Sequence, residues 1–286
     1  MFVTYGNDIE FHLLNTKRKK FVSAIPVLKN DKHSPIDLGD DIKVYADNIL
    51  VETSFPPFST KEEMMGRYRT VFGRIQNFLG KDYRLVPKAA HYYDESELLD
   101  EKALEIGCTE NFNAWEVCVN PKIEFSNNLR TAGFHCHIGH EKLTDHETRI
   151  DAVRLVDTVL GTASVIFNKN EEGEVDRRNL YGQSSEHRPT SYGLEYRCLS
   201  PATLRSPLLA ELVFDLINYC LDFSLNDKAN DVLGVVDREK VIKAINTCDA
   251  KLAEEVLNEV KLPQEFMKRI KKSYNANFYK AWDIAT

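Results

Sequence analysis

Residues 181–201 read YGQSSEHRPTSYGLEYRCLSP, and this segment carries the pattern from which the fold and the function are predicted. Glu195 and Arg197 are two residues apart in a run typical of a β-strand, so we expect their side chains on one face. Arg188 precedes Glu195 by seven residues, across a Pro-Thr-Ser-Tyr-Gly turn. A carboxylate suited to Mg²⁺ beside two guanidinium groups is the combination that a nucleotide-using site requires.

Three other strand-like segments carry residues of the same kind. Glu10 and His12 alternate with apolar residues in residues 2–14, Glu52 closes the segment 42–53, and His135 and His137 alternate with apolar residues in 129–140. A single pair of this type is usually a surface ion pair or a hydrogen-bonded histidine. Four such segments together favour a site for one or two Mg²⁺ or Mn²⁺ ions, because oxygen ligands dominate.

Zinc and several nucleotide-binding motifs are not indicated. The sequence has no H-E-x-x-H and no cysteine cluster, so a zinc site is less favoured than magnesium. Neither G-x-x-x-x-G-K-[ST] nor G-x-G-x-x-G occurs, and G-x-S-x-G is also missing. A nucleotide would therefore have to be held through metal ions and arginines.

Hydrophobic periodicity predicts one compact α+β domain with a helical C-terminal end. Strands are expected at 2–14, 21–27 and 83–93, with two more in 42–53 around a turn at 47–48. Capping boxes predict helices that begin at Thr60 and Thr144, and 169–180 is expected to be a loop. Further helices are expected at 94–103, 207–223, 237–260 and 263–274.

Composition is that of an ordinary soluble globular protein. The 286 residues carry a formal net charge of -7, which argues mildly against a nucleic-acid partner. No apolar run is long enough for a transmembrane helix and no signal peptide is recognised, so no membrane partner is expected. The six cysteines show no disulfide-scaffold pattern, and Cys108 is expected to be a buried, inert thiol. A reducing cytoplasm is the expected location.

Five motifs, in this order, resemble those of carboxylate–amine ligases: G-N-D-I-E-F, D-N-I-L-V-E-T-S-F-P-P, G-C-T-E-N-F-N-A-W, T-A-G-F-H-C-H-I-G and Y-G-x(5)-R-x(3)-Y-G-L-E-Y-R. The chain is most similar to the type 2 ligases encoded by tailed phages, in the amidoligase branch of the glutamine synthetase and glutamate–cysteine ligase superfamily. The resemblance covers about residues 5–210. It implies a host-cytoplasmic enzyme if the chain is phage-encoded.

The resemblance implies a fold and a set of metal ligands. The fold would be a strongly curved antiparallel sheet, a half-barrel, with the active site on its concave face and helices outside. Residues 1–225 would form this glutamine synthetase-like catalytic domain, with 226–286 a helical extension packed on it. The family uses ATP with Mg²⁺, and the positions that match its metal ligands are Glu10, Glu52, His135 and Glu195.

The resemblance also assigns the phosphate-binding residues. Arg188 and Arg197 match the arginines that hold the transferred phosphate, and His137 matches a position that contacts nucleotide phosphates. One position departs from the pattern, because His12 stands where the family's Glu-x-Glu strand has its second acid. Either His12 binds a metal ion itself, Asp8 or another acid substitutes, or one metal site is weakened.

The implied reaction begins when a substrate carboxylate attacks the γ-phosphate of ATP to give an acyl phosphate. An amine then displaces phosphate and forms an amide or peptide bond, with His12, His137 and His187 as candidate bases. The alternatives are an ATP-dependent guanidino or amine phosphotransferase of the same superfamily, and a non-catalytic phage binding or structural protein. The carboxylate and amine substrates (amino acid, peptide or protein side chain) would be selected by loops at 28–41, 94–128 and 168–187.

Overall fold

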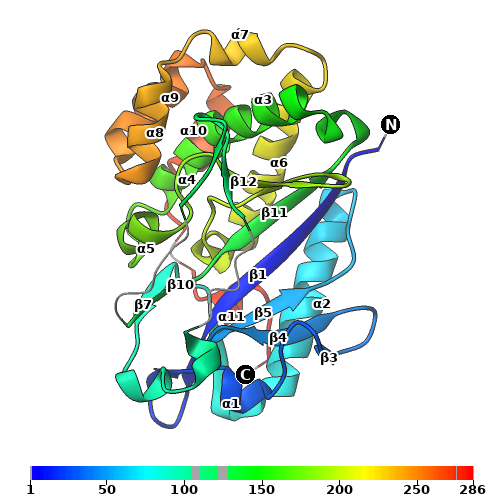
Figure 1. Ribbon diagram of the computed structural model, residues 1–286, viewed down its shortest axis with the longest axis vertical. Coiled ribbons are helices and arrows are strands. Elements are labelled where there is room, and N and C mark those ends of the chain that lie inside the picture. The colour runs from blue at the N-terminus through cyan, green and yellow to red at the C-terminus, as the bar shows by residue number, and fades with distance from the viewer. Residues whose placement is uncertain (1, 105–109, 122–127, 275, 286) are drawn as a thin grey trace.

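The computed structural model describes residues 2–104, 110–121, 128–274 and 276–285. Its main sheet is antiparallel, is not closed into a barrel, and has eleven described strands (Figure 1). In sheet order they are β3 (Ile36–Asp37), β4 (Lys43–Asp47), β5 (Leu50–Ser54), β1 (Thr4–Asn15), β11 (Phe134–Gly139), β13 (Gly193–Tyr196), β12 (Glu186–Thr190), β8 (Phe112–Asn113) and β9 (Cys118–Val119), with β2 (Lys20–Val22) and β6 (Tyr83–Val86) paired to β1. A separate two-stranded sheet pairs β7 (Ala90–Tyr92) with β10 (Leu129–Thr131). The predicted α+β class with an antiparallel sheet is confirmed.

Strand β1 connects the parts of the main sheet. Its first half pairs with β11, its middle with β5, and its last residues with β2 and β6. The alternation predicted from the sequence is present, because Ile9, Phe11 and Leu13 are fully buried. Helices cover this apolar face: the ring of Phe11 packs edge-on against Phe72 in a helix behind the sheet, with centroids 5.6 Å apart. The opposite face of β1 carries Asp8, Glu10 and His12.

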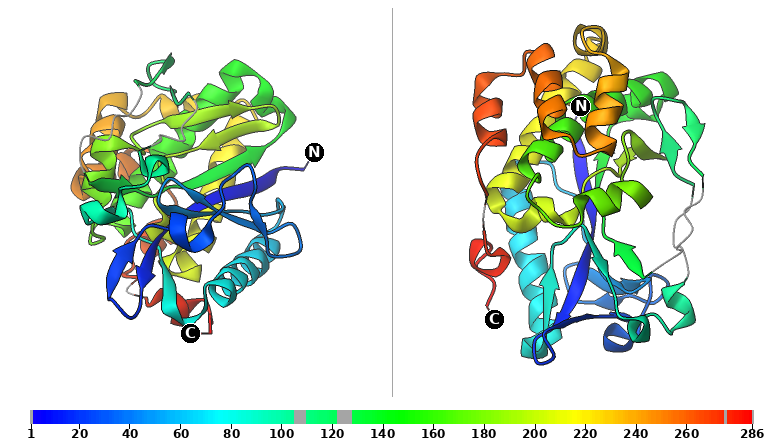
Figure 2. Two further views of the ribbon diagram at one scale, coloured as in Figure 1. Left: turned by 60° about the horizontal axis from the view of Figure 1, so that its bottom comes forward. Right: turned by 90° about the vertical axis from the view of Figure 1, so that its left-hand side faces the viewer.

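Most of the helices lie on one side of β1 and above it (Figures 1 and 2). They are α1 (Ile25–Leu28), α2 (Lys61–Leu79), α3 (His146–Val156), α4 (Thr162–Phe167), α5 (Glu174–Leu180), α6 (Pro207–Ser224), α7 (Ala229–Leu233), α8 (Arg238–Asn246), α9 (Ala250–Glu259), α10 (Gln264–Ile270) and α11 (Phe278–Ala281). A π-helical turn, Asp157–Gly161, joins α3 to α4. The predicted capping box of α2 is present, since the Thr60 side chain accepts from the Glu63 N–H.

Two predicted elements near the N-terminal half have different bounds. The strand expected at 21–27 ends at Val22 and gives way to α1, because Pro26 has no N–H to donate to a strand ladder and fits a first helical turn. The helix expected at 94–103 is two short 3₁₀ turns, 95–97 and 101–103. The predicted role of Cys108 lies outside the described residues.

Three predictions in the second half are also wrong in detail. Asp145, not Thr144, caps α3, because its carboxylate accepts the Thr148 N–H at 3.0 Å. The loop expected at 169–180 contains helix α5, whose arginines are buried rather than solvated. The single helix expected at 237–260 is two helices, since Asp249 starts a second N-cap by accepting from two backbone N–H groups.

The C-terminal helices pack into the same hydrophobic core as the sheet. Trp282 is 1% exposed and its ring lies 5.2 Å from that of Phe72 in α2. The hydroxyl of Tyr279 accepts the backbone N–H of Leu85 in β6 at 2.6 Å. In the part of the chain that the structure describes, no helix combines the length and the apolar character needed to cross a bilayer.

Candidate functional site

The strand register brings the predicted site residues to one face of the sheet. Glu10 of β1 lies opposite Glu52 of β5, and Glu195 of β13 lies between His137 of β11 and Arg188 of β12. Residues directly opposite each other on antiparallel strands project to the same side. The apolar face of β1 is occupied by helices, so these polar side chains share the other face. The sequence prediction that strand spacing would gather them is therefore confirmed for Glu10, Glu52, His137 and Glu195, whereas Arg188, expected at a turn, lies in strand β12.

One cluster, the Glu195 group, consists of Asp8, His137 and Glu195. Each offers a ligand atom within 4.8 Å of the others. Nε2 of His137 lies 3.0 Å from Asp8, and Nδ1 lies 2.7 Å from the hydroxyl of Tyr192. Burial lowers the pKa of His137, but the hydrogen bond and charge of Asp8 outweigh burial, so its net pKa is raised. The group thus combines two carboxylates with an imidazole held by partners on both sides.

Glu195 is also where the predicted phosphate-binding arginines meet. It is 1% exposed, and its carboxylate accepts from Nη1 of Arg188 at 3.1 Å and from Nη1 of Arg197. Nδ1 of His135 lies 3.4 Å from the same carboxylate. Two guanidinium groups that converge on one carboxylate supply, at this part of the site, hydrogen-bond donors of the kind that bind phosphate.

A second cluster, the Glu10 group, consists of Glu10, Asp47 and Glu52, whose carboxylate oxygens also lie within 4.8 Å of one another. The backbone N–H of Gly133 donates to Glu10 at 2.5 Å. Burial first and the charge of Asp47 second raise the pKa of Glu10 to about 8, and the same two causes raise that of Glu52. Three neighbouring acids that repel one another fit a site for a hard divalent cation such as Mg²⁺.

His12 lies apart from both clusters. It is fully buried, and its Nδ1 lies 2.7 Å from the hydroxyl of Tyr93. The rings of Phe21 and His91 lie within 6.3 Å of it, and burial lowers its pKa to about 3. Within the described residues the ligand groups contain Asp8 and Asp47 but not His12. Of the options left open by the sequence, the one in which other acids substitute agrees with this placement.

The two remaining histidines differ in their surroundings. His135 is 4% exposed and has partners at both ring nitrogens, since Nε2 lies 3.2 Å from the Tyr181 hydroxyl. Burial, followed by the charge of Arg197, lowers its pKa well below the usual value. His187 of β12 lies opposite Tyr196 of β13. Because it is next to Arg188 in the strand, its side chain points to the other face of the sheet, away from the site. His187 is thereby a poor candidate for the catalytic base.

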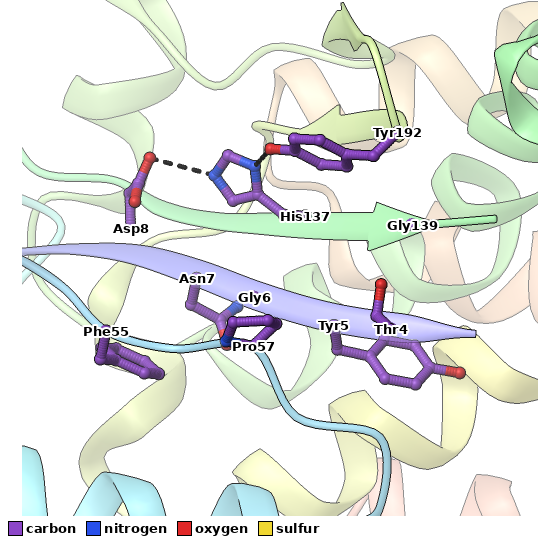
Figure 3. A pocket seen from close by; sticks show the side chains of 10 residues that line it. All are labelled: Thr4, Tyr5, Gly6, Asn7, Asp8, Phe55, Pro57, His137, Gly139 and Tyr192. Atoms are coloured by element: carbon purple, nitrogen blue, oxygen red, sulfur yellow. Dashed lines mark hydrogen bonds and ion pairs between the residues drawn. The ribbon is translucent and has the colours of Figure 1, made fainter. Parts of the chain in front are cut away.

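An open pocket of about 410 Å³ adjoins the Glu195 group (Figure 3). Asp8, His137 and Tyr192 line one side, and Phe55 and Pro57 from the segment after β5 line the other. The figure shows the imidazole of His137 between Asp8 and Tyr192 above strand β11. An apolar wall opposite a few polar groups is typical of a small-molecule site.

Sequence reasoning missed Asp47, Tyr192 and Asp157. Asp47 could have been found by pairing the two strands on either side of the 47–48 turn, since Tyr45 then lies opposite Glu52 and Asp47 follows on the same face. Asp157 lies in the π-helical turn and gave no sequence signal. Its buried carboxylate accepts from Trp115 at 2.8 Å and from Tyr196 at 2.9 Å, which fixes the outer face of β13.

Comparison of the chain with protein-family models and with curated protein sequences finds no match. The functional assignment therefore depends on the residues and geometry of the site itself.

Proposed function

We propose that the protein is an ATP-dependent carboxylate–amine ligase with a glutamine synthetase-like fold, in which the polar face of the sheet is the concave, catalytic face. One observation carries the proposal. Strands β1, β5, β11, β12 and β13 contribute Glu10, Glu52, His137, Arg188 and Glu195 to a single face, and two arginines converge on Glu195. Acids for metal ions next to arginines for phosphate are the components of a phosphoryl-transfer site.

The two acid clusters have the donor set that Mg²⁺ prefers. Glu10, Asp47 and Glu52 would hold one ion, and Asp8 with Glu195 would hold another. Mg²⁺ held by these acids would neutralise charge on phosphate oxygens and would offset both the burial and the charge of Asp47 that raise the pKa of Glu10. The family resemblance marks His135 as a metal ligand, and His12 is a candidate ligand because it departs from the family's pattern. Both of these roles stay predictions.

The pocket beside the Glu195 group suits the nucleoside of ATP. Phe55 and Pro57 offer an apolar wall, and the polar wall leads to the arginines at Glu195. A triphosphate whose base occupies this pocket would extend along the sheet past Asp8 toward Glu10. In this arrangement Arg188 and Arg197 bind the transferred phosphoryl group and stabilise charge on its oxygens.

In the proposed reaction a substrate carboxylate oxygen attacks the γ-phosphorus, the bond to the ADP oxygen breaks, and an acyl phosphate forms. The amine nitrogen then attacks the acyl carbon, phosphate leaves, and the nitrogen loses a proton. Of the three histidines considered as the base, His137 is the one that lies opposite Glu195, where the arginines bind the transferred group, and Asp8 would stabilise its protonated form. The protein would perform this chemistry in the cytoplasm.

Phosphate release from ATP, measured with Mg²⁺ and a mixed pool of amines and carboxylates, tests the proposal. Glu195→Ala and Arg197→Ala should each abolish release, because they remove a metal ligand and a phosphate-binding cation. Glu239→Ala and Arg238→Ala are matched controls, since that exposed ion pair of 3.1 Å lies outside the site. Full activity in both site variants would refute the assignment. A phosphorylated amine without amide product would indicate a phosphotransferase, and failure to bind Mg²⁺–ATP would indicate a non-catalytic protein.

A further inference from the structure

Tyr181, the residue after α5, contacts two predicted site residues at once. Its ring centroid lies 5.3 Å from Cζ of Arg197, and its hydroxyl lies 3.2 Å from Nε2 of His135. The side chain is 6% exposed. A guanidinium over an aromatic face is attracted by the ring's quadrupole, more strongly when water is excluded. Tyr181 therefore holds an arginine and a histidine that both face Glu195.

Arg177 also packs on the Tyr181 ring and fixes its position. Its Cζ lies 5.4 Å from the ring centroid, and its fully buried guanidinium donates to the backbone carbonyls of Ala132 at 2.8 Å, Cys198 at 2.7 Å and Leu199 at 2.8 Å. These carbonyls lie just before β11 and just after β13, the two strands that carry His135 and Glu195. The ring is thus located relative to both strands.

Two glycines allow this close packing. A Cβ on Gly182 would lie 1.8 Å from Nη1 of Arg177, and the backbone there has a φ of +73°. A Cβ on Gly133 would lie 2.3 Å from Nε2 of His135. The backbone approaches Arg177 and His135 so closely that neither side chain can move toward it, so the geometry around Tyr181 is tightly defined.

We propose that Tyr181 is a positioning residue for phosphoryl transfer, which stacks on Arg197 and hydrogen-bonds His135 so that both stay against Glu195. This inference rests on the proposed ligase reaction. Arg197 and Nδ1 of His135 both contact the Glu195 carboxylate, so loss of the ring would free two of its partners together. A misplaced Arg197 would stabilise the transferring phosphoryl group less, whereas the nucleoside pocket would be unchanged. The effect should therefore appear in kcat and not in the KM for ATP.

Two substitutions separate the two contacts of Tyr181. Tyr181→Phe keeps the ring and loses the hydroxyl, so kcat should fall about fivefold, whereas Tyr181→Leu loses both contacts and kcat should fall about 100-fold. The KM for ATP should stay within about twofold in both. Tyr274→Phe is the matched control, because it removes another buried tyrosine hydroxyl, which donates to the Arg269 carbonyl at the end of α10 and outside the site. Wild-type kcat in Tyr181→Leu, or an equal loss in Tyr274→Phe, would overturn the inference.

A spectroscopic measurement tests the contact without any turnover. The ¹⁵N NMR signal of Nε2 in His135 should shift in Tyr181→Phe, because the ring nitrogen loses its hydrogen-bond partner, and should stay unchanged in Tyr274→Phe. An unchanged His135 signal in Tyr181→Phe would contradict the positioning role. If the His135 signal shifts in Tyr181→Phe as expected but the wild-type protein releases no phosphate from ATP, the ligase assignment fails while the contact itself stands.

Discussion

Raising the pH of the metal-free protein from about 6 to about 8 should weaken the fold through Glu10. Burial and the neighbouring Asp47 raise the pKa of Glu10 from 4.5 to about 8 in the folded protein. The folded state therefore keeps this proton longer than the unfolded state, so the stabilisation is complete below about pH 4.5 and is lost as the pH rises through about 8. Integrating one proton over this interval gives a loss of about 2 kcal/mol between pH 6 and 8.

Urea unfolding in the presence of a chelator measures this loss in the wild type and in Glu10→Gln. Histidines and thiols titrate in both proteins, so the difference between them reports Glu10 together with its effect on the neighbouring Glu52. The wild type should lose about 2 kcal/mol more than the variant over the two pH units, and Mg²⁺ should restore the wild type at about pH 8 because it stabilises the ionised acid. An identical pH dependence in the two proteins would refute the reasoning.

Three further predictions concern single positions. Asp47→Asn should weaken Mg²⁺ binding about tenfold, measured by calorimetry, because it removes a ligand. It should also stabilise the metal-free protein in thermal unfolding, because it removes a repulsive charge, and a loss of stability would count against the Glu10 group as a metal site. Gly182→Ala should lower the free energy of unfolding by about 3 kcal/mol, since the new Cβ meets Arg177 and the φ is positive; wild-type urea stability would exclude this clash. Asp157→Asn should lower the free energy of unfolding by about 3 kcal/mol in the same urea measurement, because an amide cannot accept all the hydrogen bonds that Trp115, Ser185 and Tyr196 donate to the carboxylate. An unchanged urea midpoint would show that these hydrogen bonds are dispensable.

Much of the fold could be predicted because the local signals are strong. The alternation in residues 4–15 and the capping box at Thr60 both specify elements that the structure contains. Elements whose ends depend on a single side chain were placed less well. Asp145 takes the N-cap position expected for the adjacent Thr144, and Asp249 starts a new helix inside a continuous helical pattern; periodicity predicts neither.

The site was predicted where a residue shares a strand pattern with its neighbours, as Glu195 does with Arg197. It was not predicted where tertiary pairing decides which side chains meet. Asp47 reaches Glu10 because β4 pairs with β5 and β5 pairs with β1, two steps of register that no local pattern encodes. Asp157 and Arg177 are buried polar residues whose partners are far away in the sequence, so only the folded chain shows what they contact.

The register of β1 has a consequence for how this chain can vary. Asp8, Glu10 and His12 recur at every second residue of the strand, which sets them about 6.6 Å apart along a backbone paired on both sides. Inserting or deleting one residue before Asp8 would leave the partners in place but bring Asn7, Ile9 and Phe11 to the polar face. The strand can therefore change its chemistry one side chain at a time, but its length is fixed by the spacing of the residues that it aligns.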